Sequence, residues 1–180
     1  LPYLEMGRRY MEMLSSLTGK QHYFIDKMPM NYAFVGVIAR ALPEARFVHT
    51  VRNPMDTCFS NYKQMFGEGY YGYSYDLEDL AVHYKLYREL MAFWHEQLPG
   101  KIYDLHYEQL VDTPEAQVRK LLDWLGLTWQ PGCLEFHRRD TPVNTASVSQ
   151  VRQPIYRGSV DKWRKFGDHL KPLQIALAAF

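Results

Sequence analysis

The sequence predicts an α/β fold with a short parallel sheet flanked by helices. Two short runs rich in β-favouring apolar residues, at 22–25 and 46–51, enclose a stretch with helical periodicity. This order is typical of a parallel βαβ unit. A third run of the same kind, at 101–106, follows a long helical pattern. Strands that alternate with helices in this way favour a parallel sheet.

Apolar periodicity and end signals define the first helices. An amphipathic helix is predicted over 3–17, and another over 32–42 with Asn31 as its N-cap. The strand at 46–51 ends at an Asn-Pro pair, and Pro54 suits the first turn of a helix that runs to about residue 65.

Similar signals define the helices of the second half of the chain. Asp76 is predicted to cap a long helix that ends near residue 98. Pro114 opens a helix that stops at Gly126, because Pro favours the first helical position and Gly the position just past the end. Ser159 is predicted to cap a final helix.

Composition and net charge restrict the classes of function that this chain could have. The chain has 180 residues, 47% apolar and 23% charged, as in an ordinary globular protein, so we expect a single domain. A net charge of +1 gives no general reason to bind nucleic acid or membranes, and local Arg and Lys must hold any anionic ligand. Only Cys58 and Cys133 are present, far apart in sequence, which argues against a disulfide framework and favours the reducing cytoplasm.

Arg52 lies at the carboxyl end of a predicted strand, and Ser60 follows about two helical turns later. Ligands of open α/β sheets bind at this edge. A guanidinium with a hydroxyl nearby suits a phosphate, because Arg donates two parallel charge-assisted hydrogen bonds. The alternative is that Arg52 only pairs with a carboxylate across the loop.

Lys27 follows the strand predicted at 22–25. In a parallel sheet Lys27 and Arg52 leave neighbouring strands at one edge, where two cations suit a polyanion such as a phosphorylated nucleotide.

Four ordered motifs resemble the sulfotransferases that use 3′-phosphoadenosine-5′-phosphosulfate (PAPS). The bacterial branch often found behind tetratricopeptide repeats, related to tyrosylprotein sulfotransferases, is the most similar. The resemblance covers about residues 22–173. Its motifs are Asp26-Lys27-Met28-Pro29-x-Asn31, Arg52-Asn53-Pro54-x-Asp56-x-x-x-Ser60, Tyr107-Glu108-x-Leu110-Val111, and Thr145-Ala146-Ser147-x-x-Gln150-Val151-Arg152-Gln153-Pro154-x-Tyr156-x-x-Ser159-x-x-Trp163.

The resemblance implies transfer of a sulfuryl group from PAPS to a hydroxyl or amine, with no metal, on a P-loop-NTPase-like three-layer fold. It also implies that Arg52 and Ser60 hold the 3′-phosphate and that Lys27 stabilises the bridging oxygen. Tyr107 and the late residues Ser147, Arg152 and Tyr156 are expected to line the nucleotide pocket. Tyr107 could instead be a core residue at a strand end.

The sequence departs from the family pattern at two points. The first strand and its Pro-x-Ser-Gly-Thr type loop, which cradles the 5′-phosphosulfate, are missing, and the glutamate base is missing with them. Met28 stands where cytosolic sulfotransferases carry a catalytic histidine, and His49 is expected to be a core or surface residue. We therefore expect an incomplete domain with weak or no activity alone, and self-association through an exposed sheet edge.

Other functions fit parts of the sequence. A non-catalytic nucleotide-binding or interaction module could keep this fold without the phosphosulfate loop. A P-loop kinase relative is the weakest alternative, because the chain has neither a Walker loop nor an evident magnesium carboxylate. The Tyr/Gly-rich loop at 67–75 and the basic cluster at 137–139 are candidates to contact the acceptor.

Overall fold

The computed structural model describes residues 2–19, 22–66, 69, 71–138 and 152–178. The chain divides into two compact units. Unit 1 holds Leu1–Phe47 and Leu86–Ile102, and unit 2 holds Val48–Lys85 and Tyr103–Phe180. The α-helices, short 3-10 helices (η) and strands follow in this order: α1 (Tyr3–Thr18), η1 (Pro29–Ala33), α2 (Val35–Ala41), β1 (Phe47–Val51), α3 (Pro54–Tyr62), η2 (Gly72–Tyr75), α4 (Leu77–Gln97), β2 (Ile102–His106), α5 (Tyr107–Asp112), α6 (Pro114–Leu125), η3 (Pro131–Cys133), η4 (Phe136–Arg138), η5 (Lys162–Leu170) and α8 (Lys171–Ala178).

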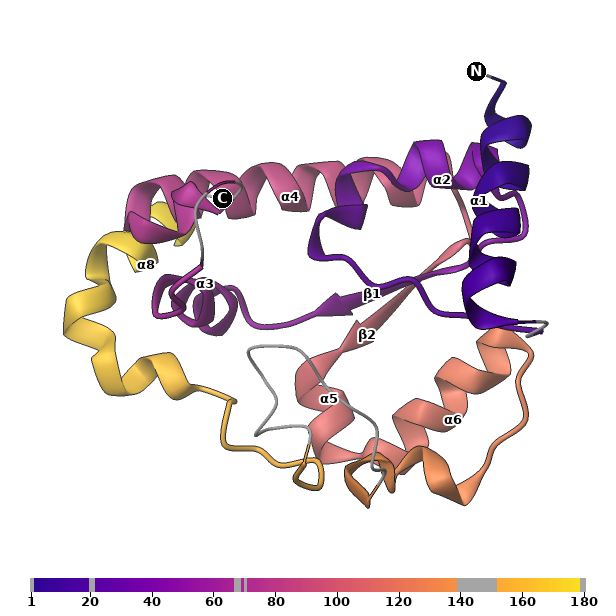
Figure 1. The fold of residues 1–180 in the computed structure, drawn as a ribbon. Helices are drawn as coiled ribbons and strands as arrows, with labels where there is room; N and C mark the ends of the chain where they lie inside the picture. The colour runs from indigo at the N-terminus through magenta and orange to yellow at the C-terminus, as the bar shows by residue number, and fades with distance from the viewer. Residues whose placement is uncertain (1, 20–21, 67–68, 70, 139–151, 179–180) are drawn as a thin grey trace. The chain divides into compact units, whose positions relative to one another are not determined.

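The two strands form the short parallel sheet that the sequence predicts, with helices flanking it (Figure 1). Burial alternates along β1, as expected for a strand that presents two different faces. The carboxyl end of β1 leads through Arg52 and Asn53 into α3, and β2 leads directly into α5. Both strands therefore bring polar residues to one edge of the sheet.

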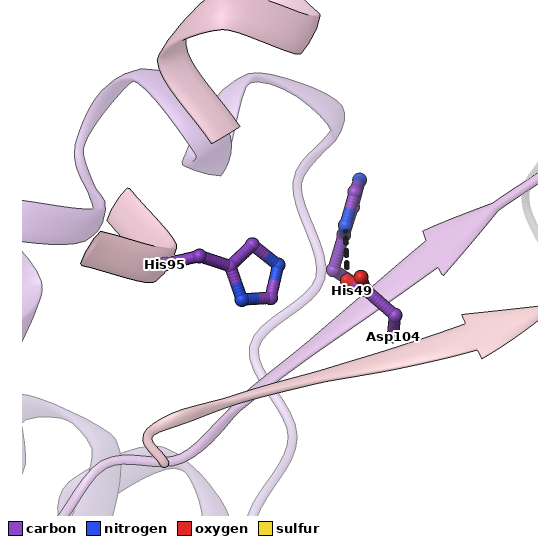
Figure 2. Close-up of side chains that lie close together, drawn as sticks. All are labelled: His49, His95 and Asp104. Carbon is purple, nitrogen blue, oxygen red and sulfur yellow. Dashed lines mark hydrogen bonds and ion pairs between the residues drawn. The ribbon is translucent and has the colours of Figure 1, made fainter. Parts of the chain in front are cut away.

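A side-chain pair joins the two strands. The Nδ1 atom of His49 on β1 lies 2.7 Å from Oδ1 of Asp104 on β2 (Figure 2). Only 12% of the His49 side chain is exposed. His49 is therefore a half-buried residue whose side chain links β1 to β2.

The core of unit 2 forms around α3, the first turns of α4 and the C-terminal helices. Cys58 and Leu173 are completely buried, and burial raises the pKa of the Cys58 thiol to about 12. The other buried members are Met55, Phe59, Leu80, Ala81 and Leu170. α4 begins as predicted, because Oδ1 of Asp76 accepts the N–H groups of Glu78 and Asp79.

The core of unit 1 forms where α2, the second half of α4 and the first residue of β2 meet. Val35, Met91 and Ile102 are buried there. The indole N–H of Trp94 donates to the Tyr32 carbonyl at 2.8 Å, which satisfies the polar end of a large apolar side chain. A Cβ atom at Gly36 would lie 2.7 Å from the Trp94 ring, so glycine is required for this packing.

The strand predicted at 22–25 is wrong. Residues 23–28 have no regular secondary structure, and Tyr23 and Ile25 are 73% and 93% exposed. A strand needs a neighbour that completes its hydrogen-bond ladder, and β1 pairs only with β2 among the described residues. A β-favouring sequence is therefore insufficient here without a partner.

Two predicted helix caps and one predicted helix end are also wrong. Asn31 lies inside η1, which Pro29 opens, and α2 begins only at Val35. The helix expected to reach residue 65 ends at Tyr62. Ser159 does not cap the last helices. η5 begins at Lys162, and the N–H groups at its start are bound by the side chain of Asp56 on α3.

The exposed run at 22–25 gives a prediction about assembly. If this run pairs with a second copy, Ile25→Ser is expected to raise the dissociation constant of the self-associated form about tenfold, because an isoleucine contact is lost. Met65→Ser is a matched control, since Met65 is 89% exposed and lies outside the run. Light scattering at high concentration measures both; a wild-type chain that stays monomeric would contradict the expectation.

Among the helices that the structure describes, none combines the length and the apolar character needed to cross a bilayer.

Candidate functional site

Arg52 stands at the centre of the candidate site, directly after the last residue of β1. Its guanidinium lies 5.1 Å from the centroid of the Tyr107 ring, at the end of β2, and its Nη2 atom donates to the Ser159 carbonyl. The Nε atom is buried and has no hydrogen-bond partner among the described residues. The arginine is thus held in place by Ser159 while its buried Nε donor lacks an acceptor among the described residues, and 23% of its side chain is exposed.

The Asp56 carboxylate connects Arg52 to the backbone before and within η5. Its side chain is completely buried in the first turn of α3, and its Oδ1 atom lies 3.8 Å from Nη2 of Arg52. The same carboxylate accepts the backbone N–H groups of Asp161 at 2.7 Å and Trp163 at 3.2 Å. A residue of α3 thus caps η5, more than 100 positions later in the chain.

The turn from β1 into α3 is fixed by two further hydrogen bonds. The Asn53 side chain caps α3 by accepting the N–H of Asp56 at 3.2 Å. The Asn53 backbone N–H donates to Oε1 of Glu108 at 2.8 Å. Since Glu108 follows Tyr107, the residues after β2 orient the residues after β1.

Ser60 lies on α3 and is half-buried. It stands four residues after Asp56, so that it shares a face of the helix with the carboxylate that neighbours Arg52. The structure therefore keeps Ser60 and Arg52 in the same unit and on connected elements.

Two lysines extend the positive charge around Arg52. Lys63 follows the end of α3, with its Nζ atom 5.5 Å from the centroid of the Phe59 ring. Burial lowers the pKa of Lys63, and the charges of Lys162 and Arg52 lower it further. The group is therefore in a cluster of like charges.

Lys27 belongs to unit 1. It is exposed and lies in the irregular segment 23–28. The neighbouring Asp26 carboxylate accepts a hydrogen bond from the hydroxyl of Tyr10, which raises the pKa of that tyrosine to about 12. The side chain of Asn31 also donates to Asp26 at 3.4 Å, so the segment before η1 is anchored at Asp26.

The late residues predicted to line a nucleotide pocket are only partly described. Ser147 lies outside the described residues, together with the rest of the first part of its motif, residues 145–151, and with Arg139. Arg152 and Tyr156 are exposed residues of unit 2. The Tyr156 ring packs close to Gly158, where an added Cβ atom would approach it to 3.0 Å.

Sequence reasoning missed the residues that hold the site together. In the sequence, Asp56 looks like any acidic residue in the first turn of a helix. Glu108 is notable only because it follows Tyr107, a candidate site residue. Lys63 and Lys162 carry no local motif. The only available signal was that Asp56 and Glu108 occupy fixed positions of the motifs that contain Arg52 and Tyr107.

A solved structure shows the same fold. The sulfotransferase domain from the curacin biosynthetic pathway superposes with a TM-score of 0.65 and covers 88% of this chain and 60% of its own. At 20% identity this similarity concerns the fold alone, which is therefore that of a sulfotransferase domain. The model of the sulfotransferase family matches residues 1–131, and the chain belongs to this family.

Two curated relatives are similar to this chain. An uncharacterized protein of Aquifex aeolicus is 37% identical over 166 residues, which are 91% of this chain and 22% of that protein. An omega-hydroxy-beta-dihydromenaquinone-9 sulfotransferase of Mycobacterium tuberculosis is 33% identical over 110 residues, or 57% of this chain and 28% of that enzyme. The chain thus spans about a quarter of the length of these relatives.

Proposed function

We propose that this chain is the part of a PAPS-dependent sulfotransferase that binds the 3′-phosphate of the donor. The observation that carries the proposal is the fixed guanidinium of Arg52, at the end of β1, with a buried Nε donor that lacks a partner among the described residues. A phosphate oxygen is the acceptor that such a donor suits best. Ser60 would add a hydroxyl from α3, the helix whose first turn holds Asp56.

The reaction proposed for the whole protein is direct transfer of the sulfuryl group. An oxygen or nitrogen of the acceptor attacks sulfur, the bond from sulfur to the 5′-phosphate oxygen breaks, and 3′-phosphoadenosine-5′-phosphate (PAP) leaves. The acceptor proton passes to a base that the described residues do not identify. Negative charge develops on the leaving oxygen, and Lys27 is proposed to stabilise it there.

The nucleotide would lie along the edge of the sheet. Tyr107 follows β2 and could stack on the adenine or hold Arg52, to which its ring is already close. Arg152, Tyr156 and Ser147 are proposed to close the pocket from the later segment. No metal is proposed, and the location proposed for the protein is the cytoplasm, where PAPS would be the soluble donor.

Lys27→Ala tests the catalytic part of the proposal. In the full-length protein, with ³⁵S-labelled PAPS and a panel of phenols, alcohols and amines, kcat is expected to fall about a hundredfold. The affinity for PAP is expected to change less than about twofold, because PAP lacks the transferred group. Lys120→Ala is the control, since Lys120 is an exposed lysine on α6.

Each result has a distinct meaning. If Lys27→Ala lost both PAP binding and turnover, Lys27 would act in binding and not on the leaving oxygen. A wild-type protein that binds PAP but transfers no ³⁵S to any acceptor would favour a non-catalytic nucleotide-binding module instead.

A further inference from the structure

The residues around Lys27 form a turn that closes on itself. Asp26 and Asn31, the first and last residues of this motif, contact each other, since the Asn31 side chain donates to Oδ1 of Asp26 at 3.4 Å. The backbone N–H of Asn31 also donates to the Met28 carbonyl at 3.0 Å. Pro29 restricts the backbone inside the turn and opens η1. Lys27 therefore lies between two residues that hydrogen bonds to Asn31 restrain.

Tyr10 on α1 attaches this turn to the helix at two points. Its hydroxyl donates to Oδ2 of Asp26, and its ring centroid lies 6.2 Å from that of the Phe24 ring. All three residues belong to unit 1. The hydrogen bond to Asp26 raises the pKa of Tyr10 to about 12, so the hydroxyl stays protonated and can donate at neutral pH. One polar and one aromatic contact thus bind the segment before Lys27 to a helix.

Regular secondary structure does not hold this segment in place. Residues 23–28 belong to neither a helix nor a strand, and the side chains of Tyr23, Ile25 and Met28 are exposed. A displacement of about 1 Å can cost a catalytic group on the order of a hundredfold in rate. A residue that fixes the backbone beside Lys27 would therefore influence the reaction without touching the reacting atoms.

We propose that Tyr10 is a positioning residue, which holds the backbone at Lys27 through its hydrogen bond to Asp26. This inference rests on the proposed function, since it concerns the lysine that is proposed to stabilise the leaving oxygen. The ring and the hydroxyl of Tyr10 have separate parts in it. The ring packs near Phe24, and the hydroxyl fixes the carboxylate of the residue that directly precedes Lys27.

Tyr10→Phe tests the hydroxyl alone, because the phenylalanine ring keeps the contact with Phe24. In the full-length protein, with ³⁵S-labelled PAPS and the same acceptor panel as for Lys27→Ala, kcat is expected to fall about tenfold. The affinity for PAP is expected to change less than about twofold, because PAP lacks the transferred group. Tyr3→Phe is the matched control from α1, since the Tyr3 ring lies 4.7 Å from the Arg40 guanidinium, and it should leave both values unchanged.

A double-mutant cycle separates positioning from a general loosening of the fold. In a Lys27→Ala background, Tyr10→Phe is expected to lower kcat less than about twofold, because no ammonium group is left to place. An equal tenfold loss in both backgrounds would mean that the hydroxyl serves the fold as a whole, and the inference would be overturned.

Two variants of Asp26 test the link between Tyr10 and Lys27. Asp26→Asn keeps an oxygen that can accept the Tyr10 hydroxyl, so we expect a loss in kcat of about threefold, against about tenfold for Asp26→Ala. If the two variants lost activity equally, Asp26 would act through its charge and not through Tyr10, which contradicts the proposal.

Amide hydrogen exchange gives a readout that needs no acceptor. Amides of residues 23–28 are expected to exchange several-fold faster in Tyr10→Phe than in the wild type or in Tyr3→Phe, because the segment loses its polar contact with α1. Unchanged exchange would show that Tyr10 does not hold the segment, and the inference would fail.

The kinetic outcomes separate the two proposals. If Lys27→Ala lowers kcat about a hundredfold while Tyr10→Phe leaves it unchanged, the role of Lys27 stands and that of Tyr10 is overturned. If Lys27→Ala itself leaves kcat unchanged, the proposed role of Lys27 fails, and the inference about Tyr10 falls with it.

Discussion

Arg52→Ala is expected to lower the affinity of the full-length protein for PAP about a hundredfold. The guanidinium can donate two charge-assisted hydrogen bonds to one phosphate, each worth roughly 1.5–3 kcal/mol, and a hundredfold change corresponds to about 2.7 kcal/mol. Titration calorimetry with PAP measures the effect directly. The affinity for adenosine 5′-phosphate (AMP) should hardly change, because AMP lacks the phosphate that Arg52 is proposed to bind.

Arg52→Lys separates the shape of the side chain from its charge. Lysine keeps the positive charge and loses the fork, so we expect an intermediate loss of about tenfold. Both variants also lose the bond to the Ser159 carbonyl, so thermal unfolding must accompany the titrations. A folded Arg52→Ala protein that binds PAP like the wild type would remove Arg52 from the donor site.

The position of Arg52 could be predicted because it follows from local rules. Residues 46–51 include Phe47, Val48 and Val51, which favour a strand, and Asn53 and Pro54 stop the strand and start the helix that the structure contains. A strand that turns directly into a helix places the residue between them at the edge of the sheet. The same local signals predicted α4 from Asp76 and the end of α6 at Gly126, which has the left-handed conformation that favours glycine.

The connections across the chain could not be predicted in this way. Asp56 binds the amides of Asp161 and Trp163, and Asn53 binds Glu108, more than 50 residues away in each case. Helix and strand periodicity describe neighbours within a few residues, and they contain no signal for partners at such separations. The expected cap at Ser159 was wrong for this reason, because a buried carboxylate from α3 satisfies the amides that a local cap would have bound.

The strand predicted at 22–25 failed for a related reason. Alternation and β-propensity indicate that a segment can pair, whereas a strand exists only where another backbone completes the ladder. The exposed Tyr23 and Ile25 show that the propensity is present without the partner. Lys27 comes directly after this segment. Because the segment is no strand, Lys27 and Arg52 do not leave neighbouring strands of one sheet, and the role of Lys27 stays a prediction.

Asp56→Ala is expected to cause the largest loss of stability of any single change in the site, about 3–5 kcal/mol. The carboxylate is completely buried, and its removal leaves two backbone N–H groups without a charged acceptor. It also leaves the positive charge of Arg52 without its neighbouring carboxylate. Urea unfolding followed by circular dichroism measures the change. Since the Asp56 carboxylate lies 3.8 Å from Nη2 of Arg52, the folded variant should also bind PAP more weakly than the wild type.

Asp56→Asn shows whether the charge or the shape of Asp56 matters. The amide oxygen can still accept one of the two N–H groups, but its NH₂ group must face the other or Arg52, so we expect roughly half of the loss seen with alanine. Asp168→Ala is the control from η5, where the carboxylate is 91% exposed in a surface ion pair, and it should change stability by less than about 0.5 kcal/mol. If Asp56→Ala proved no more harmful than Asp168→Ala, the carboxylate could not be what joins α3 to η5, and the order of the site would have to come from the packing of Phe59 against Phe166.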